Sequence, residues 1–115
     1  MQSGSTFLNG VPELLILRLL RDREMYGYEL VQAIREATRE EILLAEGVVY
    51  PVLHGLERSG ALSARRQTVQ GRSRIYYSVT PAGSERLAGL TDQWRRLNAS
   101  IAAILGGPGH ARSPA

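Results

Sequence analysis

Arginine is the side chain through which this sequence could do chemistry, because the chain contains neither lysine nor cysteine. Arginines cluster between residues 61 and 81, a stretch that contains no acidic residue. The cluster consists of Arg65, Arg66, Arg72 and Arg74, with Gly71 and Ser73 among them. A guanidinium group donates paired hydrogen bonds that match phosphate oxygens and guanine edges. The cluster therefore indicates a polyanionic partner, although a solvated charged surface has the same composition.

A second set of polar residues lies on one stripe of a predicted helix over residues 46–58. The stripe holds Gly47, Tyr50, Pro51, His54 and Arg58, and it lies opposite the apolar residues of the same helix. It lacks the Glu and Lys residues of an ordinary exposed face. Such a helix could enter the major groove of DNA, with Val48 beside the stripe and Tyr28 at the start of the preceding helix. Double-stranded DNA is therefore the predicted partner.

Catalysis finds no support in the remaining residues. The chain has two histidines, His54 and His110, and neither has the companions of a catalytic triad. With His110 in the predicted tail, His54 is left among scattered carboxylates, which do not make the ligand set of a transition-metal site. No glycine motif that binds phosphate follows a strand. The sequence predicts a protein that is not an enzyme and that uses no cofactor or metal.

The elements that must position these residues follow from periodicity. Apolar spacing predicts helices that begin near Val11, Tyr28 and Glu46. Alternating residues after Gly60 predict a β-hairpin, with residues 67–73 as its loop. A last helix follows Thr80, the expected N-cap residue, and Gly106 is expected to end it.

The last helix carries an a/d heptad pattern with successive spacings of 3, 4, 3, 4 and 3 residues. Its members are Leu87, Leu90, Trp94, Leu97, Ile101 and Ile104. A terminal helix with this pattern predicts a homodimer, and packing on its own domain is the alternative. Trp94 either packs in this seam or faces its symmetry mate and lines a cavity for flat apolar molecules.

Together these elements predict a mainly α fold with a small β-hairpin, a winged helix-turn-helix plus a C-terminal dimerisation helix. The expected organisation is a flexible segment over residues 1–10, a DNA-binding domain over 11–81, a dimerisation helix over 82–105 and a disordered tail over 106–115. Charge is uneven, with −4 over residues 1–57 and +6 over residues 58–96. No signal peptide or membrane span is recognisable, so we expect a cytoplasmic protein.

Four strings in this sequence resemble motifs of the PadR family of bacterial regulators. Residues 26–30 resemble the YGYEL start of that family's second helix, and residues 46–53 its EGTLYPAL recognition helix. Residues 56–62 are similar to its LexxGLV strand entry, and residues 74–83 to its RRYYxLTxxG segment. The matches keep their order from about Val11 to Leu105.

The resemblance implies a dimeric repressor that binds palindromic operator DNA and is relieved by a small aromatic or lipophilic effector. Some members bind planar drugs against a Trp in the last helix, and Trp94 has a similar place. This chain departs from the family at Ala45 and Val48, where Ser and Thr are common. The alternatives are a winged-helix module for protein interaction without sequence-specific DNA binding, and a repressor without a ligand, for which Trp94 is only packing.

Overall fold

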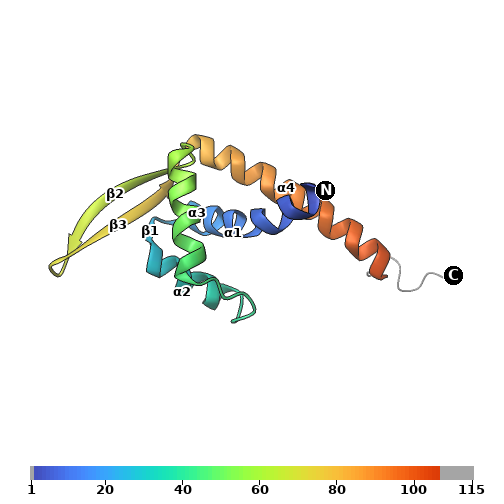
Figure 1. Ribbon diagram of the computed structural model, residues 1–115, viewed down its shortest axis with the longest axis horizontal. Coiled ribbons are helices and arrows are strands. Elements are labelled where there is room, and N and C mark those ends of the chain that lie inside the picture. Colours follow the sequence, from blue (N-terminus) through green and yellow to red (C-terminus); the bar gives the residue numbers. More distant parts are fainter. Residues whose placement is uncertain (1, 107–115) are drawn as a thin grey trace.

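The computed structural model describes residues 2–106, and their side chains from residue 10 onward. Four helices and three strands follow one another as α1, β1, α2, α3, β2, β3 and α4 (Figure 1). Their bounds are α1 Gln2–Asp22, β1 Met25–Tyr26, α2 Gly27–Ala37, α3 Glu46–Arg58, β2 Leu62–Val69, β3 Arg72–Val79 and α4 Pro81–Leu105. The predicted fold class, a mainly helical winged helix-turn-helix with a long C-terminal helix, is confirmed. None of these helices is long and apolar enough to cross a membrane.

The core lies where the apolar stripes of the first three helices meet. Each helix contributes side chains that are at most 2% exposed, at helical spacings of three, four or one residue. These residues are Ile16 and Leu17 of α1, Leu30 and Ile34 of α2, and Val49, Leu53 and Leu56 of α3. Burying an aliphatic side chain of this size contributes about 1.5–3 kcal/mol relative to leaving it in water. This packing fixes the orientation of α3 and therefore the direction of its exposed stripe.

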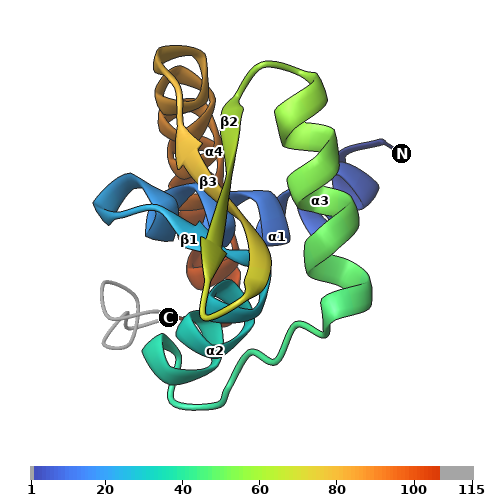
Figure 2. The ribbon, with the colours of Figure 1, turned by 90° about the vertical axis from the view of Figure 1, so that its left-hand side faces the viewer.

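The three strands form one antiparallel sheet in the order β1–β3–β2. β2 and β3 make the wing, which projects from the helical body and faces the viewer in Figure 2. They are joined by a two-residue turn in which Gln70 and Gly71 have φ angles of 53° and 78°. Two positive φ angles are the signature of the type I′ turn, whose twist matches that of a hairpin.

The wing differs from the sequence prediction in two respects. Residues 67–73 were expected as a loop, which is wrong, because the strands continue to Val69 and resume at Arg72. Both faces of the outer wing meet solvent, so its residues carry no apolar alternation. Strand β1 was not predicted, since a strand of two residues has no readable period.

Helix α1 begins at Gln2, whereas the sequence predicted a flexible segment over residues 1–10 and a helix start near Val11. Pro12 lies inside the helix, where proline removes one backbone donor. Packing against α4 favours the longer helix: a Cβ on Gly10 would lie 3.6 Å from Leu90 Cδ2, an ordinary van der Waals contact. The predicted tail after Gly106 lies outside the described residues.

Helix α4 begins as predicted and then leaves the body. Thr80 caps it, with its hydroxyl accepting a hydrogen bond of 3.1 Å from the Gly83 amide, and Gly106 ends it with a φ of 79°. A bidentate ion pair between Arg86 and Glu13, with contacts of 3.0–3.1 Å, holds the first part of α4 against α1. The distal part extends beyond the other helices (Figure 1).

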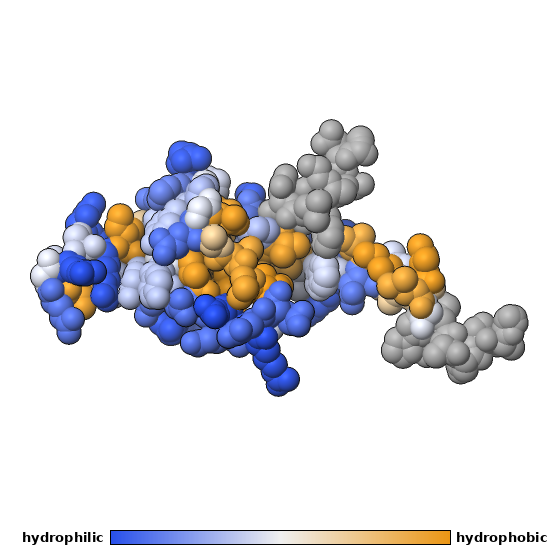
Figure 3. Space-filling model, turned by 60° about the horizontal axis from the view of Figure 1, so that its bottom comes forward, coloured by the Kyte–Doolittle hydropathy of each residue, from blue (hydrophilic) through white to orange (hydrophobic). Residues whose placement is uncertain are grey.

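The predicted heptad seam is divided between these two parts of α4. Leu87 is 3% exposed and packs in the core with Leu90 beside it. Trp94, Ile101 and Ile104 are 39%, 43% and 86% exposed. The apolar end of the helix is the orange projection in Figure 3. The first two seam positions therefore pack within their own chain, which was the alternative, while Trp94, Ile101 and Ile104 remain exposed to solvent.

Candidate nucleic-acid interface

Helix α3 presents most of the predicted stripe to solvent. Because Val49, Leu53 and Leu56 face the core, the opposite side of the helix is directed outward. Its exposed residues include Gly47, Val48, Pro51, His54 and Arg58. A Cβ on Gly47 would meet no other atom within 4 Å, so this part of the helix is unobstructed.

Tyr50 differs from the rest of the stripe because it is half-buried against α2. A Cβ on Gly27 would lie only 2.4 Å from Tyr50 Cε1 and 2.7 Å from its hydroxyl oxygen. The ring therefore occupies the space that any other side chain at position 27 would need. Burial raises the pKa of the Tyr50 hydroxyl, and the Glu46 carboxylate raises it further. The hydroxyl thus stays protonated at neutral pH and can donate a hydrogen bond.

Strand β1 and the start of α2 form the second wall. Gly27 lies beneath Tyr50, and the Tyr26 amide donates a hydrogen bond of 3.2 Å to Glu29 Oε1, which fixes the first turn of α2. Tyr28 follows and is 50% exposed. The Tyr26-Gly27-Tyr28 sequence therefore places one ring on each side of a glycine that α3 approaches closely.

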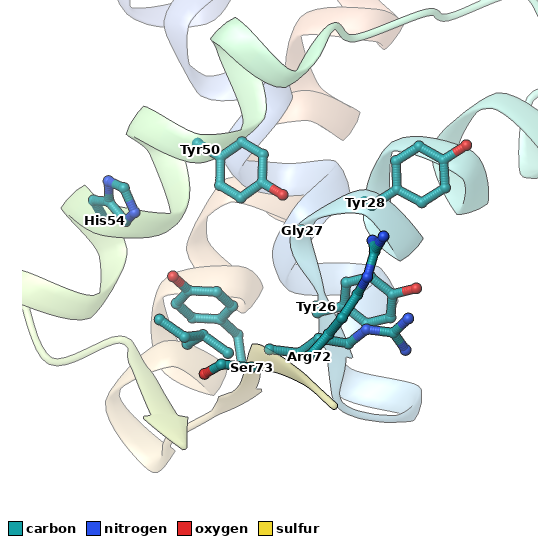
Figure 4. Close-up of a pocket in the computed structure, with 10 residues that line it drawn as sticks. Tyr26, Gly27, Tyr28, Tyr50, His54, Arg72 and Ser73 are labelled. Atoms are coloured by element: carbon teal, nitrogen blue, oxygen red, sulfur yellow. The ribbon is translucent and has the colours of Figure 1, made fainter. Parts of the chain in front are cut away.

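A groove of about 610 Å³ separates these walls from the wing (Figure 4). Its lining is aromatic and cationic, and among the described residues no carboxylate contributes to it. The lining consists of Tyr26, Gly27, Tyr28, Tyr50, His54, Arg72, Ser73, Arg74, Ile75 and Tyr77. Such a surface carries positive charge and hydrogen-bond donors, which suits a phosphate backbone.

The predicted site residues are thus only partly brought together. Tyr28, Tyr50, His54, Arg72, Ser73 and Arg74 share the groove, whereas Arg58, Arg65 and Arg66 do not line it. Sequence reasoning missed Tyr26, Gly27, Ile75 and Tyr77 as lining residues. Tyr26 and Gly27 had been noticed only as part of a family motif, and the pairing of β1 with β3 that gives them their place leaves no periodic signal.

The wing arginines have different surroundings. Arg65 is paired with Glu24 through two hydrogen bonds, and Arg66 Nη1 donates a hydrogen bond of 2.7 Å to Ser73 Oγ. The Arg74 guanidinium lies over the Tyr26 ring, 4.5 Å from its centre. Among residues 10–106, whose side chains the structure describes, no ion pair involves Arg72, so its guanidinium remains available for an external anion.

Comparisons with known proteins agree with this geometry. The family model described as the transcriptional regulator PadR-like family matches residues 16–89. The chain is 36% identical over 104 residues to the transcriptional regulator Rv3488 of Mycobacterium tuberculosis, covering 90% of this chain and 92% of that protein.

Solved structures show the same likeness. The structure of smu.1704 from Streptococcus mutans UA159 matches with a TM-score of 0.75 and 34% identity, covering 86% of this chain and 90% of that one. A PadR family transcriptional regulator from Eggerthella lenta DSM 2243 matches with a TM-score of 0.75 and 28% identity, covering 90% of each chain. The predictions of a transcriptional regulator and of a protein that is not an enzyme are confirmed, and the chain belongs to the PadR-like family of transcriptional regulators.

Proposed function

We propose that this regulator binds palindromic operator DNA as a homodimer, with α3 in the major groove and the wing on the flanking backbone. The carrying observation is the groove between α2, α3 and the wing, which is lined by tyrosines, His54, Arg72 and Arg74. Phosphate contacts position a protein on DNA, and contacts with base edges give it sequence specificity. In this proposal α3 makes the contacts with bases, and the wing makes most of the contacts with phosphates.

Helix α3 supplies the contacts with bases in this proposal. His54 and Arg58 can donate hydrogen bonds to base edges, and the exposed Val48 offers an apolar contact of the kind that thymine methyl groups accept. The protonated Tyr50 hydroxyl, held in place by Gly27, can donate to a phosphate. Gly47 and Pro51 are small, so they do not protrude between these side chains.

The wing supplies the contacts with phosphates. Arg72 stands next to the turn, and Arg74 and Ser73 follow it along the groove side of the wing. Arg66 bonds to Ser73 and thereby contributes charge near the turn without lining the groove itself. Gly71 allows the tight turn that brings these groups to the tip of the wing.

The distal part of α4 is the proposed dimer contact. Its exposed apolar residues, Trp94, Ile101 and Ile104, continue the heptad pattern of Leu87, Leu90 and Leu97. Pairing with a second copy would remove them from water. The two recognition helices would then lie about one DNA turn apart, roughly 34 Å, as two half-sites of a palindrome require.

The position of Trp94 supports a further proposal, that a small aromatic or lipophilic effector relieves repression. The indole is 39% exposed in one chain and lies at the point where α4 leaves the body. A flat molecule bound between two such rings would change the separation of the recognition helices. Titration with a broad panel of apolar aromatics should quench Trp94 fluorescence for at least one compound. A panel without effect would contradict this part of the proposal.

The test of DNA binding compares Arg72→Ala with Arg18→Ala. Arg18 is exposed on α1, does not line the groove, and pairs with Asp22 on the same helix. Loss of a phosphate contact should weaken duplex binding and lower the slope of log K against log salt by about 1. Arg18→Ala should leave both quantities unchanged. Equal behaviour of the two variants would favour the alternative, a winged-helix module that binds protein rather than DNA.

A further inference from the structure

The outer wing has few contacts that could fix its angle. Strand β1 pairs with β3 only at Tyr76 and Tyr77, so β2 and β3 form a two-stranded ribbon beyond that point. An isolated two-stranded hairpin is at best marginally stable in water. On one side of the sheet, the part of the wing nearest the helices is buried in the core through Leu62 and Tyr77. The opposite side must be held by something else.

Five side chains form a connected stack on that opposite side, which we call the wing latch: Glu24, Tyr26, Arg65, Arg74 and Tyr76. Arg65 on β2 donates to both carboxylate oxygens of Glu24, which lies just before β1, with Nε to Oε1 at 3.0 Å. The same guanidinium lies over the Tyr76 ring, 5.2 Å from its centre. The Tyr76 ring meets the Tyr26 ring edge to face, with ring centres 5.4 Å apart. The Arg74 guanidinium lies over the Tyr26 ring.

The hydrogen bonds in the wing latch favour the charged forms of both Glu24 and Arg65. The hydrogen bonds from Arg65 lower the pKa of the Glu24 carboxyl, and the same bonds raise the pKa of Arg65. Gln67 accepts a third hydrogen bond from Arg65, at 2.6 Å from Nη1. The guanidinium therefore has a carboxylate, an amide and an aromatic ring as partners within its own chain.

We propose that Arg65 is a positioning residue, which fixes the wing relative to α3 through Glu24 and Tyr76 instead of contacting DNA. This inference rests on the proposed DNA binding. Where the wing stands determines whether Arg72 can reach a phosphate while α3 lies in the major groove. A loosened wing must be ordered upon binding, which lowers affinity without removing a phosphate contact.

Glu24→Gln gives this inference a test with a definite sign. Removing a negative charge near DNA would by itself strengthen binding, whereas loosening the latch weakens it. We expect Glu24→Gln to bind about threefold to fivefold more weakly, as the loss of one exposed ion pair implies, with an unchanged salt slope. The probe is the duplex that the wild-type protein enriches from a randomised pool. Glu41→Gln, an exposed residue outside the latch, is the matched control and should not weaken binding.

Arg65→Lys completes the binding test because lysine keeps the charge but loses the paired donors. We expect the same loss as for Glu24→Gln. Tighter or unchanged binding by Glu24→Gln would overturn the inference, as would wild-type affinity in Arg65→Lys.

Hydrogen exchange provides a readout that needs no DNA. Backbone amides of residues 65–76 should exchange faster in Glu24→Gln than in the wild type and in Glu41→Gln, and equal rates would overturn the inference whichever way affinity moves. If the wild type enriches no duplex, the proposed function fails, and hydrogen exchange alone decides whether the latch holds the wing.

Discussion

Gly27 and Tyr50 show how one residue without a side chain shapes the interface. The Tyr50 ring lies where a Cβ at position 27 would be, so Gly27→Ala must move the ring or separate α2 from α3. Overpacking of this kind costs about 1–3 kcal/mol in the free energy of unfolding. Urea denaturation should show this loss even though alanine is the better helix former.

The same substitution in a Tyr50→Leu background isolates the contact. With the ring removed, Gly27→Ala should cost less than about 1 kcal/mol, and the difference between the two backgrounds is the coupling energy of the pair. An equal cost in both backgrounds would show that position 27 needs glycine for a reason other than Tyr50.

Contacts between individual side chains were the part of the structure least predictable from the sequence. The types of residue that line the groove were predicted, because tyrosine, histidine and arginine on a helix or hairpin are typical of DNA contacts. The side chains that contact these residues were not predicted. That Arg65 meets Glu24, 41 positions away in the chain, depends on the pairing of three strands, and composition carries no trace of it.

At the scale of elements, the wing and α4 meet in a tight contact around Thr80. Thr80 donates a hydrogen bond of 2.6 Å from its hydroxyl to the Gly60 carbonyl, and its amide donates to the Ala61 carbonyl at 3.1 Å. A Cβ on Gly83 would lie 2.1 Å from the Ala61 carbonyl oxygen, which is backbone and cannot turn aside. The start of α4 is therefore seated directly on the entry to β2.

Two alanine substitutions in α4 should have opposite effects on stability. Gly83→Ala should lower the free energy of unfolding by about 3 kcal/mol or more, because backbone must move. Gly89→Ala, where a Cβ meets nothing within 4 Å, should raise it by about 0.5–1 kcal/mol through reduced chain entropy. Thermal unfolding of both variants is the measurement, and destabilisation by Gly89→Ala would show that α4 has a neighbour at that position.

Elements with a strong period were predictable, and those without one were not. Helix α3 spans the predicted residues, because a buried stripe and a glycine stop coincide there, and the Thr80 cap and the Gly106 end of α4 were predicted from local chemistry. The two-residue β1, the outer wing and the first turns of α1 were missed. In each, pairing or packing with a distant segment determines the structure, and local propensity does not.

At the scale of the whole molecule, the exposed end of α4 predicts how copies associate. Ile101→Asp combined with Ile104→Asp should convert the proposed dimer into monomers, because it places carboxylates in an apolar seam. Ala99→Asp adds the same kind of charge at the heptad position farthest from the seam and should leave the dimer intact. Analytical ultracentrifugation distinguishes the two variants, and a dimer that survives the double substitution would locate the contact elsewhere.

Fluorescence anisotropy decides whether the positively charged groove between α3 and the wing binds specific duplex DNA. The measurement uses the protein with the DNA upstream of its own gene, across a salt series and with random duplex as competitor. We expect tight binding that survives the competitor and weakens steeply as salt rises. Weak and equal affinity for both duplexes, with a flat response to salt, would contradict this expectation.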